Sequence, residues 1–536
     1  MRVFKINPLL VMLIVLISII GGVLATYATA NGPWGYSDPV AYISTARSLA
    51  NGQGLGYYEG DAEFSQSTIQ PPFYPIVLSV LGLFKINLVA GARWLNIIAF
   101  IASIFIAGWI FYRYSRIPAL GIIASALMCA FPYMVVMFSS AYSEPLFILF
   151  FLLGGLCLLI YLNNEKLPML LISALLVGMV PLTRYAGIAM VIAGGLSVLI
   201  FVSGNTWSRV KKLFLYVFTA SLPILIWLVW VYFSTAHTIG GRSLNLNWAG
   251  LAAQFQAFRG IFMDTVWKWV PFQTHQTLLR YMVRFIMMGV GLVIIVVLSI
   301  FAERRIRRAS PRDANKSGIH IFTFFGLSSM TFIGVLIATY LFTHPTIDID
   351  NRTLLPFYVS AVMSLLGGVA LWHYAWFKGR MLILQVIPWI IAVICVVWYF
   401  PQTRDEIEFY HSGDGLTAYH WNSSETIQAV RALPSNKPVI SNDWELLLLW
   451  SGRPIYGLWT TFPSRTPIQT SAYGTNPGDR IQSVFCAKGA ALVIFSDFPS
   501  QYKNQIGGLS SDQLPDLFAG LPVYGEYKDG TIYLCH

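Results

Sequence analysis

Ser37-Asp38-Pro39-Val40-Ala41-Tyr42-Ile43-Ser44-Thr45-Ala46-Arg47 follows the first apolar run of the chain, which covers residues 8–28. A hydrocarbon core of about 30 Å requires about 20 apolar residues in a helix, so this run is long enough to cross a membrane. It is also longer than the apolar part of a signal peptide, which has roughly 7 to 15 residues. Asp38 is therefore expected beside a membrane surface, in a loop that follows a first membrane-spanning helix.

The composition agrees with a membrane protein. Of the 536 residues, 56% are hydrophobic and only 11% are charged, whereas soluble domains have about 25% charged residues. The mean hydropathy is +0.62. A formal charge of +11 would suggest nucleic acid binding in a soluble protein, but many basic residues here lie in short loops between apolar runs. We predict a polytopic α-helical membrane protein with no nucleic-acid site.

Apolar runs of similar length recur along most of the chain, and their lengths predict about eleven membrane-spanning helices. These cover residues 8–28, 89–111, 118–137, 145–162, 167–183, 185–203, 213–233, 281–302, 318–342, 353–375 and 381–400. The run at residues 73–86 has only about 14 residues, so we expect an interfacial or re-entrant helix there.

Basic residues in the short loops set the expected orientation, because cytoplasmic loops carry an excess of Lys and Arg. With a cytoplasmic N-terminus, the following residues lie inside: Arg2, Lys5, Arg113, Arg116, Lys166, Arg209, Lys211, Lys212, the run Arg304-Arg305-Ile306-Arg307-Arg308, Lys378 and Arg380. A full span at residues 73–86 would turn the later groups outward. A first outer loop (30–88), a second outer loop (234–280) and the C-terminal tail are then extracytoplasmic, and we expect the membrane to be a bacterial inner membrane.

The tail at residues 401–536 is polar and has no run long enough to span a membrane. Alternating helix and strand patterns predict a small extracytoplasmic α/β domain, and Lys528-Asp529-Gly530 is a hairpin signal between two closing strands. We therefore divide the chain into a membrane domain at 1–400 and an outer domain at 401–536. The tail cysteines, Cys486 and Cys535, can form a disulfide outside the cell or remain two thiols.

Two carboxylates stand out because ionisable groups beside membrane spans are costly and indicate function. Asp38 precedes Tyr42 and Thr45 at helical spacing, so the three can line one face of a short helix. Glu144 lies directly before Pro145, at the predicted outer junction of two spans. The structural alternative for each acid is that it stabilises the start of a helix.

Two arginines are predicted at the same outer face. Arg184 lies between two apolar runs and Arg352 opens a late one. Arg suits bidentate phosphate recognition, while the structural alternative is snorkelling or pairing with a local acid such as Asp350. His344, which precedes Pro345, is either a metal ligand or a polar loop residue, and we favour the loop residue.

The order of these motifs resembles the GT-C superfamily of membrane glycosyltransferases. The resemblance covers about residues 1–375, and relatives in the superfamily include protein O-mannosyltransferase-like enzymes and the lipid A aminoarabinose transferase. It rests on Asp38 early in the first outer loop, Pro71-Pro72-Phe73-Tyr74-Pro75, Glu144, Thr183-Arg184, and Arg352-Thr353-Leu354-Leu355-Pro356.

The resemblance implies a polyprenyl-phosphate-linked sugar donor and a site at the outer face. Asp38 matches the catalytic acid of the first loop, and Glu144 matches a second acid that is often associated with a divalent cation. Asp38 and Glu144 are therefore candidate ligands of Mg, Mn or Zn, and His344 is a third candidate on its residue type alone. Arg184 and Arg352 match positions near the donor phosphate, and Tyr42 and Tyr74 join them as candidate substrate-binding residues.

One departure concerns the first loop. Many mannosyltransferase members have an Asp-Glu pair there, whereas Ser37 and Pro39 flank a single acid in this chain. The resemblance therefore implies neither mannose as the sugar nor protein as the acceptor, which could be a protein, a lipid or a glycan.

The expected function is an inverting transfer of sugar with Asp38 as general base, in contact with membrane lipid. One alternative is a flippase or transporter of lipid-linked sugars, although transporters place ionisable groups near the midplane and often have repeats. Another is an O-antigen polymerase or ligase, which would depend on outer-loop arginines such as Arg242 and Arg259.

Overall fold

The computed structural model describes residues 7–115, 117–235, 243–244, 250–269, 316–344, 346–376, 382–458, 486, 489–496 and 521–534. The chain forms two compact units. Unit 1 comprises Met1–Ala28, Thr68–Tyr74 and Trp94–Phe409, and unit 2 comprises Thr29–Ser67, Pro75–Arg93 and Tyr410–His536.

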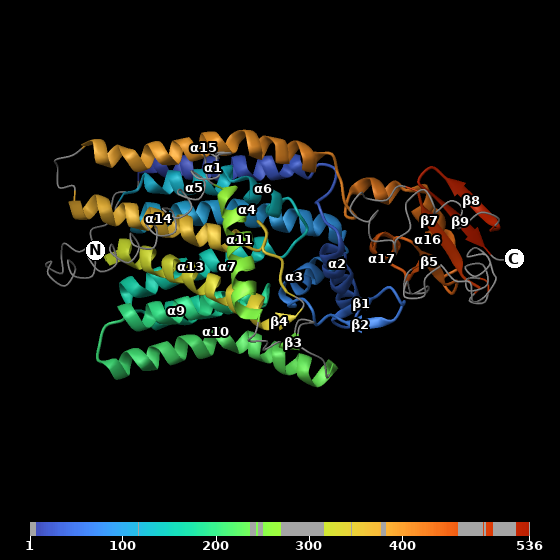
Figure 1. The fold of residues 1–536 in the computed structure, drawn as a ribbon, viewed down its shortest axis with the longest axis horizontal. Coiled ribbons are helices and arrows are strands. Elements are labelled where there is room, and N and C mark those ends of the chain that lie inside the picture. The colour runs from blue at the N-terminus through green and yellow to red at the C-terminus, as the bar shows by residue number, and fades with distance from the viewer. Residues whose placement is uncertain are drawn as a thin grey trace. The chain divides into compact units, whose positions relative to one another are not determined.

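Long apolar helices dominate unit 1, and Figure 1 shows them running roughly parallel to one another. Five helices of the described residues are long and apolar enough to cross a membrane. They are α1 (Pro8–Ala28), α4 (Leu88–Tyr114), α7 (Glu144–Asn164), α10 (Thr206–Thr235) and α13 (Lys316–Phe342).

Two further apolar helices, α5 (Leu120–Ala130) and α6 (Pro132–Phe138), are bent by 65° relative to each other, which is the geometry of a broken span or of a re-entrant loop. Pro132 explains the break, because proline at the first turn starts a helix but cannot continue the one before it. The other helices of unit 1 are α8 (Leu167–Met179), the 3-10 turn η1 (Tyr185–Gly187), α9 (Ile188–Phe201), α11 (Leu251–Trp267), α14 (Leu355–Trp376) and α15 (Leu382–His411).

The chain is thus a helical, multi-span membrane protein, as its composition predicts. Each predicted span within the described residues overlaps a helix, while the predicted span at 281–302 lies outside them. By length and composition, five or six of the described helices qualify as single spans, so the count of about eleven stays a prediction. The run at 73–86 forms α3 (Phe73–Leu83), which at 11 residues is too short to cross as one helix.

Small residues allow the helices of unit 1 to approach closely, as is common in membrane bundles. A Cβ atom added to Gly178 of α8 would lie 2.5 Å from the carbonyl oxygen of Ala220 in α10. One added to Gly121 of α5 would lie 2.6 Å from the carbonyl oxygen of Gly108 in α4. Substitutions at these two glycines would therefore push helices apart.

The C-terminal part of unit 2 contains a mixed five-stranded sheet in the order β6-β5-β7-β9-β8. Strands β6, β5 and β7 are parallel, whereas β9 and β8 are antiparallel to their neighbours. The strands are β5 (Val439–Ser441), β6 (Tyr456–Gly457), β7 (Ala491–Phe495), β8 (Val523–Tyr527) and β9 (Gly530–Leu534), with helices α16 (Glu425–Ala432) and α17 (Trp444–Ser451). The hairpin turns at Lys528 and Asp529, as its Asp-Gly signal predicts.

The first loop also belongs to unit 2. It contains α2 (Ser37–Ala50) and an antiparallel pair of short strands, β1 (Gly56–Tyr58) and β2 (Phe64–Gln66). Leu416 N–H donates to the carbonyl oxygen of Gly35 at 2.8 Å, and Tyr419 N–H donates to that of Asn31 at 2.8 Å. The predicted membrane domain at 1–400 includes this loop, and no local sequence pattern reveals these long-range backbone bonds.

Arg47 ties α2 to α17. Its guanidinium donates to the carbonyl oxygens of Leu448 at 3.1 Å and Leu449 at 2.6 Å, in the last turn of α17. The last carbonyl groups of a helix lack partners within the helix, and a cation there is favoured by the helix dipole. Burial lowers the pKa of Arg47 to about 10, helped by the charge of Arg431, so the side chain remains charged at neutral pH.

We expect Arg47→Met to destabilise the protein by about 2–4 kcal/mol, because two hydrogen bonds to a charged donor are lost. Thermal unfolding of the purified protein measures the loss. Arg404→Met is the control, since Arg404 pairs with Glu408 on an exposed helix surface, where water screens such pairs and they contribute little to stability. If both variants lose the same stability, the contact of Arg47 with α17 does not stabilise the protein more than an exposed ion pair does.

Asp443 makes the stability of unit 2 depend on pH. Its side chain caps α17 by accepting from Leu446 N–H at 3.0 Å. Burial raises the pKa of Asp443 to about 7; the Leu446 hydrogen bond opposes this and the charge of Glu445 adds to it. The folded state thus holds a proton that the unfolded state, with a pKa near 3.8, releases. Stability should therefore fall as pH rises from about 4 to about 7.

Asp443→Asn is expected to raise the unfolding temperature at pH 8 and to leave it unchanged near pH 3. Asn still caps the helix, and it carries no charge that must be buried. Thermal unfolding across this pH range gives the comparison, and parallel curves for wild type and variant would contradict the assignment.

Candidate active site

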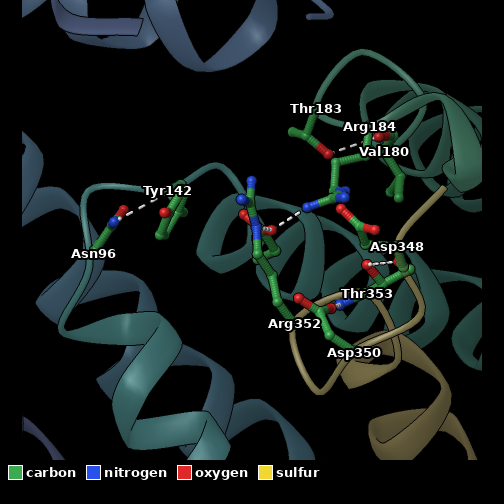
Figure 2. Close-up of polar contacts among 10 residues, drawn as sticks. Asn96, Tyr142, Val180, Thr183, Arg184, Asp348, Asp350, Arg352 and Thr353 are labelled. Carbon is green, nitrogen blue, oxygen red and sulfur yellow. Dashed lines mark hydrogen bonds and ion pairs between the residues drawn. The ribbon is translucent and has the colours of Figure 1, made fainter. Parts of the chain in front are cut away.

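Glu144 is the centre of a buried ion-pair network in unit 1. It is the first residue of α7, and its side chain is 0% exposed. One carboxylate oxygen, Oε1, accepts from Nη1 of Arg184 and from Nε of Arg352 (Figure 2). The two arginine side chains are 28% and 21% exposed. A buried carboxylate therefore fixes two guanidinium groups that still reach the surface.

Arg184 reaches this carboxylate from a break between α8 and η1. Val180 holds the break together: its carbonyl oxygen accepts from the backbone of Thr183 at 3.0 Å and of Arg184 at 3.2 Å. The Thr183 hydroxyl also donates to it at 2.7 Å (Figure 2). Gly187 is required here, because a Cβ atom would lie 2.6 Å from the carbonyl carbon of Val180.

Arg352 comes from a turn that precedes α14. Asp350 Oδ1 accepts from Thr353 N–H at 2.7 Å, and the Thr353 hydroxyl donates to the carbonyl oxygen of Asp348 at 2.9 Å. The Arg352 guanidinium lies 3.8 Å from the centre of the Tyr142 ring, a cation–π contact. Figure 2 also shows the exposed Asp348 side chain pointing toward Arg184.

Asn96 supports the turn that carries Glu144. Its Nδ2 donates to the carbonyl oxygens of Ser140 at 2.6 Å and Tyr142 at 3.2 Å, and to the Tyr74 hydroxyl at 3.2 Å. Asn96 and Tyr74 are both 0% exposed. Sequence analysis missed Asn96 and Tyr142, although an Asn inside an apolar run is a recognisable signal.

The Pro-Pro segment packs against the same region of unit 1. Phe73 N–H donates to the carbonyl oxygen of Leu182 at 3.0 Å, and the Tyr185 hydroxyl donates to that of Thr68 at 3.2 Å. This segment therefore borders the break that positions Arg184. The structure thus brings four of the residues chosen from sequence into one region of unit 1: Tyr74, Glu144, Arg184 and Arg352.

Asp38 and Tyr42 lie in unit 2. The N-cap of α2 is Tyr36, so Asp38 is not the cap but lies in the first turn, where the helix dipole favours a carboxylate. Ser37 Oγ, beside it, donates to Glu445 Oε2 of α17 at 2.8 Å. Tyr42 is 3% exposed.

The surroundings of Asp38 are acidic. Burial raises the pKa of the nearby Tyr57, and the charges of Glu59, Glu445 and Asp38 raise it further.

The described residues include no group of three or more His, Cys, Asp or Glu side chains that could hold a metal ion. Glu144 could supply one ligand atom, since its buried Oε2 has no hydrogen-bond partner among them. His344 is exposed and lies in β4 (Thr343–His344), which pairs with β3 (Ser243–Leu244). Among the described residues the predicted cation therefore has an incomplete ligand set.

This chain is similar in structure to several solved membrane proteins. No protein-family model and no curated protein matches the chain. The crystal structure of the Archaeoglobus fulgidus oligosaccharyltransferase in its apo form is 12% identical, with a TM-score of 0.48, over 90% of this chain and 69% of that one. The same enzyme was crystallised in complex with Zn and sulfate.

A second similar structure is ArnT from Cupriavidus metallidurans bound to undecaprenyl phosphate. It is 14% identical, with a TM-score of 0.40, over 97% of both chains. Both proteins are GT-C membrane glycosyltransferases, and this chain is similar to them over most of its length.

Proposed function

We propose that this protein is an inverting glycosyltransferase that moves a sugar from a polyprenyl-phosphate donor to an acceptor at the outer membrane face. The observation that carries the proposal is the network in which buried Glu144 orients the partly exposed Arg184 and Arg352. A single carboxylate that holds two arginines by one oxygen is suited to presenting both of them to a phosphate.

The arginines suit the phosphate of such a donor. Each guanidinium has five N–H donors in a planar fork, and Glu144 Oε1 accepts one of them from each arginine. Arg binds phosphate oxygens in pairs, so further donors on the two groups can clamp one phosphate. Fixed positive charges would also stabilise the charge that develops on the phosphate as it leaves.

The polyprenyl chain would follow α10. Trp227 of α10 donates its indole N–H to the Tyr185 hydroxyl at 3.1 Å, next to Arg184 in the sequence. The side chains of α10 near this point are large, apolar and exposed, which suits contact with acyl or prenyl chains. They include Leu225, Ile226, Val229 and Phe233.

Asp38 would act as the general base. It takes the proton of the acceptor hydroxyl while the oxygen attacks the anomeric carbon, and the bond from that carbon to the phosphate oxygen breaks. The polyprenyl phosphate leaves with the bonding electrons, and the sugar is inverted. A phosphate leaving group needs little protonation, so one base suffices where a glycosidase needs an acid as well.

The charges of the short loops support a cytoplasmic N-terminus and an extracytoplasmic C-terminal domain, in a bacterial inner membrane. Cys486 in the C-terminal region is disulfide-bonded, which suits an oxidising compartment; Cys535 lies outside the described residues. The position of Glu144 at the first residue of a span favours an enzyme over a transporter, whose charged groups lie near the midplane.

Transfer of label from radiolabelled polyprenyl-phosphate sugars tests the proposal. Purified protein is incubated with several such donors and with total membrane extract as the acceptor. We expect label to move from at least one donor into lipid, glycan or protein. Movement of the intact donor across vesicles, without transfer, would instead identify a flippase.

A divalent cation, Mg, Mn or Zn, is a further part of the proposal, with Glu144 Oε2 as one ligand. A chelator is then expected to lower the transfer rate, and adding back one of the three metals should restore it. An unchanged rate after chelation would show that Glu144 is not a metal ligand and that it binds only the two arginines.

A further inference from the structure

The C-terminal part of unit 2 contains a cavity of about 440 Å³ that the proposed transfer chemistry does not use. Pockets for small molecules typically measure about 300–1,000 Å³. The residues that line it are His420, Trp421, Ser423, Ser424, Glu425, Ser496, Lys528 and Asp529.

The cavity lies at the carboxyl end of β7, which is one of the two strands beside a reversal of strand order in the sheet. Strand β6 lies on one side of β5 and β7 on the other, so the order of the parallel strands reverses at β5. Ligands of such sheets bind outside the carboxyl ends of the strands at this reversal. Ser496, which directly follows β7, and the β8–β9 turn both line the cavity. The topology therefore predicts a binding site at this edge.

Hydrogen bonds hold the chain beside the cavity in place before any ligand binds. Asn442, at the carboxyl end of β5, donates to the carbonyl oxygen of Phe495 at 3.1 Å and accepts from its N–H at 3.0 Å. Ser496 N–H donates to the carbonyl oxygen of Asp529 at 3.1 Å. Two of the lining residues, Ser496 and Asp529, are thus held in place by the sheet, which lowers the ordering cost of binding.

The start of α16 also borders the cavity, but its first N–H groups are occupied. Asp529 Oδ1 accepts from the N–H of Thr426 at 3.3 Å and from its hydroxyl at 2.7 Å. Ser424 Oγ accepts from Ile427 N–H at 3.0 Å. This helix terminus therefore does not offer an anion site.

The charges in the cavity also disfavour an anion. Glu425 and Asp529 contribute two carboxylates, against one ammonium group from Lys528. Burial lowers the pKa of His420, opposed by the charges of Asp414 and Asp529, so the imidazole is neutral at pH 7. These charges therefore disfavour an anionic ligand, and because Lys528 offsets one of the two carboxylates, a neutral polar ligand suits the lining.

We propose that this cavity binds a neutral saccharide unit. Carboxylates accept hydrogen bonds, an ammonium group donates them, and serine hydroxyls do both, which matches a ring with several hydroxyl groups. The His420 ring, whose centre lies 4.6 Å from that of the Trp421 ring at an interplanar angle of 42°, supplies the apolar surface for the C–H face of a sugar. Its role in selecting a glycan acceptor rests on the proposed function, whereas the binding itself does not.

Saturation-transfer NMR on the full-length protein tests the site, in nanodiscs so that no sugar-based detergent competes. The probes are glucose, galactose, mannose, rhamnose and N-acetylglucosamine, with inorganic phosphate as the anionic probe. We expect at least one sugar to bind, and Glu425→Gln with Lys528→Ala to raise its Kd about tenfold or more. The matched control removes the same charges outside the cavity, with Glu526→Gln and Lys437→Ala, and should bind as the wild type does.

The inference is overturned if none of the sugars binds, if the cavity variant binds as tightly as its control, or if phosphate displaces the sugar. Both variants change side chains at or near the surface, so equal unfolding temperatures will confirm that they are folded. If the protein binds a sugar but transfers no label, the proposed function fails and the site remains. If it transfers label but binds no sugar, only this inference fails.

Discussion

Asp38→Asn is expected to abolish sugar transfer, lowering the rate by about 10²–10⁴-fold or more, because Asn cannot take the proton of the acceptor. The fold should persist. Asn is nearly the same size, and α2 remains tied to α17 by the Ser37–Glu445 bond and by Arg47. Initial rates of transfer, the Kd of the donor and the unfolding temperature together separate a chemical defect from a structural one.

Asp61→Asn is the matched control for this variant. Asp61 is an exposed carboxylate of the same loop, and its Oδ1 accepts from Glu63 N–H at 2.9 Å. This control should transfer at the wild-type rate. If the Asp38→Asn variant still transfers sugar, Asp38 is not the general base.

Glu144→Ala is expected to have the second large effect, on folding and on activity together. It removes the buried carboxylate that pairs with both Arg184 and Arg352, and breaking a buried pair in this way costs about 3–5 kcal/mol. We expect a lower unfolding temperature and no measurable transfer. Glu144→Gln keeps an acceptor oxygen and should fold better than the Ala variant, but with a raised KM for the donor.

A triple replacement separates the two roles of this network. Replacing Glu144, Arg184 and Arg352 together by Leu, Met and Met removes all three charges, and buried ion-pair networks exchanged for apolar residues are often equally or more stable. The triple variant should therefore recover stability relative to Glu144→Ala while remaining inactive. Recovery of transfer along with stability would mean that the network is purely structural.

Several site residues could be chosen from sequence because they are charged within apolar surroundings. Glu144, Arg184 and Arg352 come from three separate junctions, and their common predicted face made a shared site plausible before any contact was known. Their convergence on one carboxylate oxygen could not be predicted, because it depends on how α7, α8 and α14 pack. The partner that positions the turn, Asn96, is visible in the sequence only as one polar residue among many.

The first loop shows where sequence patterns stop being informative. Its helix at Ser37–Ala50 follows from local signals, but its membership of unit 2 depends on backbone bonds such as that from Leu416 to Gly35. Gly415 allows this approach with φ of +93°, and a Cβ atom there would lie 2.7 Å from the Gly35 carbonyl oxygen. The need for glycine at residue 415 can be recognised only when the positions of both chain segments are known.

Helix lengths were predicted less well than helix positions. The run at 167–183 suggested a full span, but α8 ends at Met179 because the chain turns at Val180 to place Thr183 and Arg184. The site thus shortens the helix that precedes it.

Binding of radiolabelled polyprenyl phosphate tests the central claim most directly. The purified wild type is compared with a variant that carries Arg184→Gln and Arg352→Gln, and with Arg209→Gln, which changes a basic residue of the predicted cytoplasmic side. We predict saturable binding by the wild type and by Arg209→Gln, and a Kd raised about 100-fold or more in the double variant, because two charge-assisted contacts are lost. Equal affinity in all three proteins would contradict the assignment of the Glu144 network as the donor phosphate site.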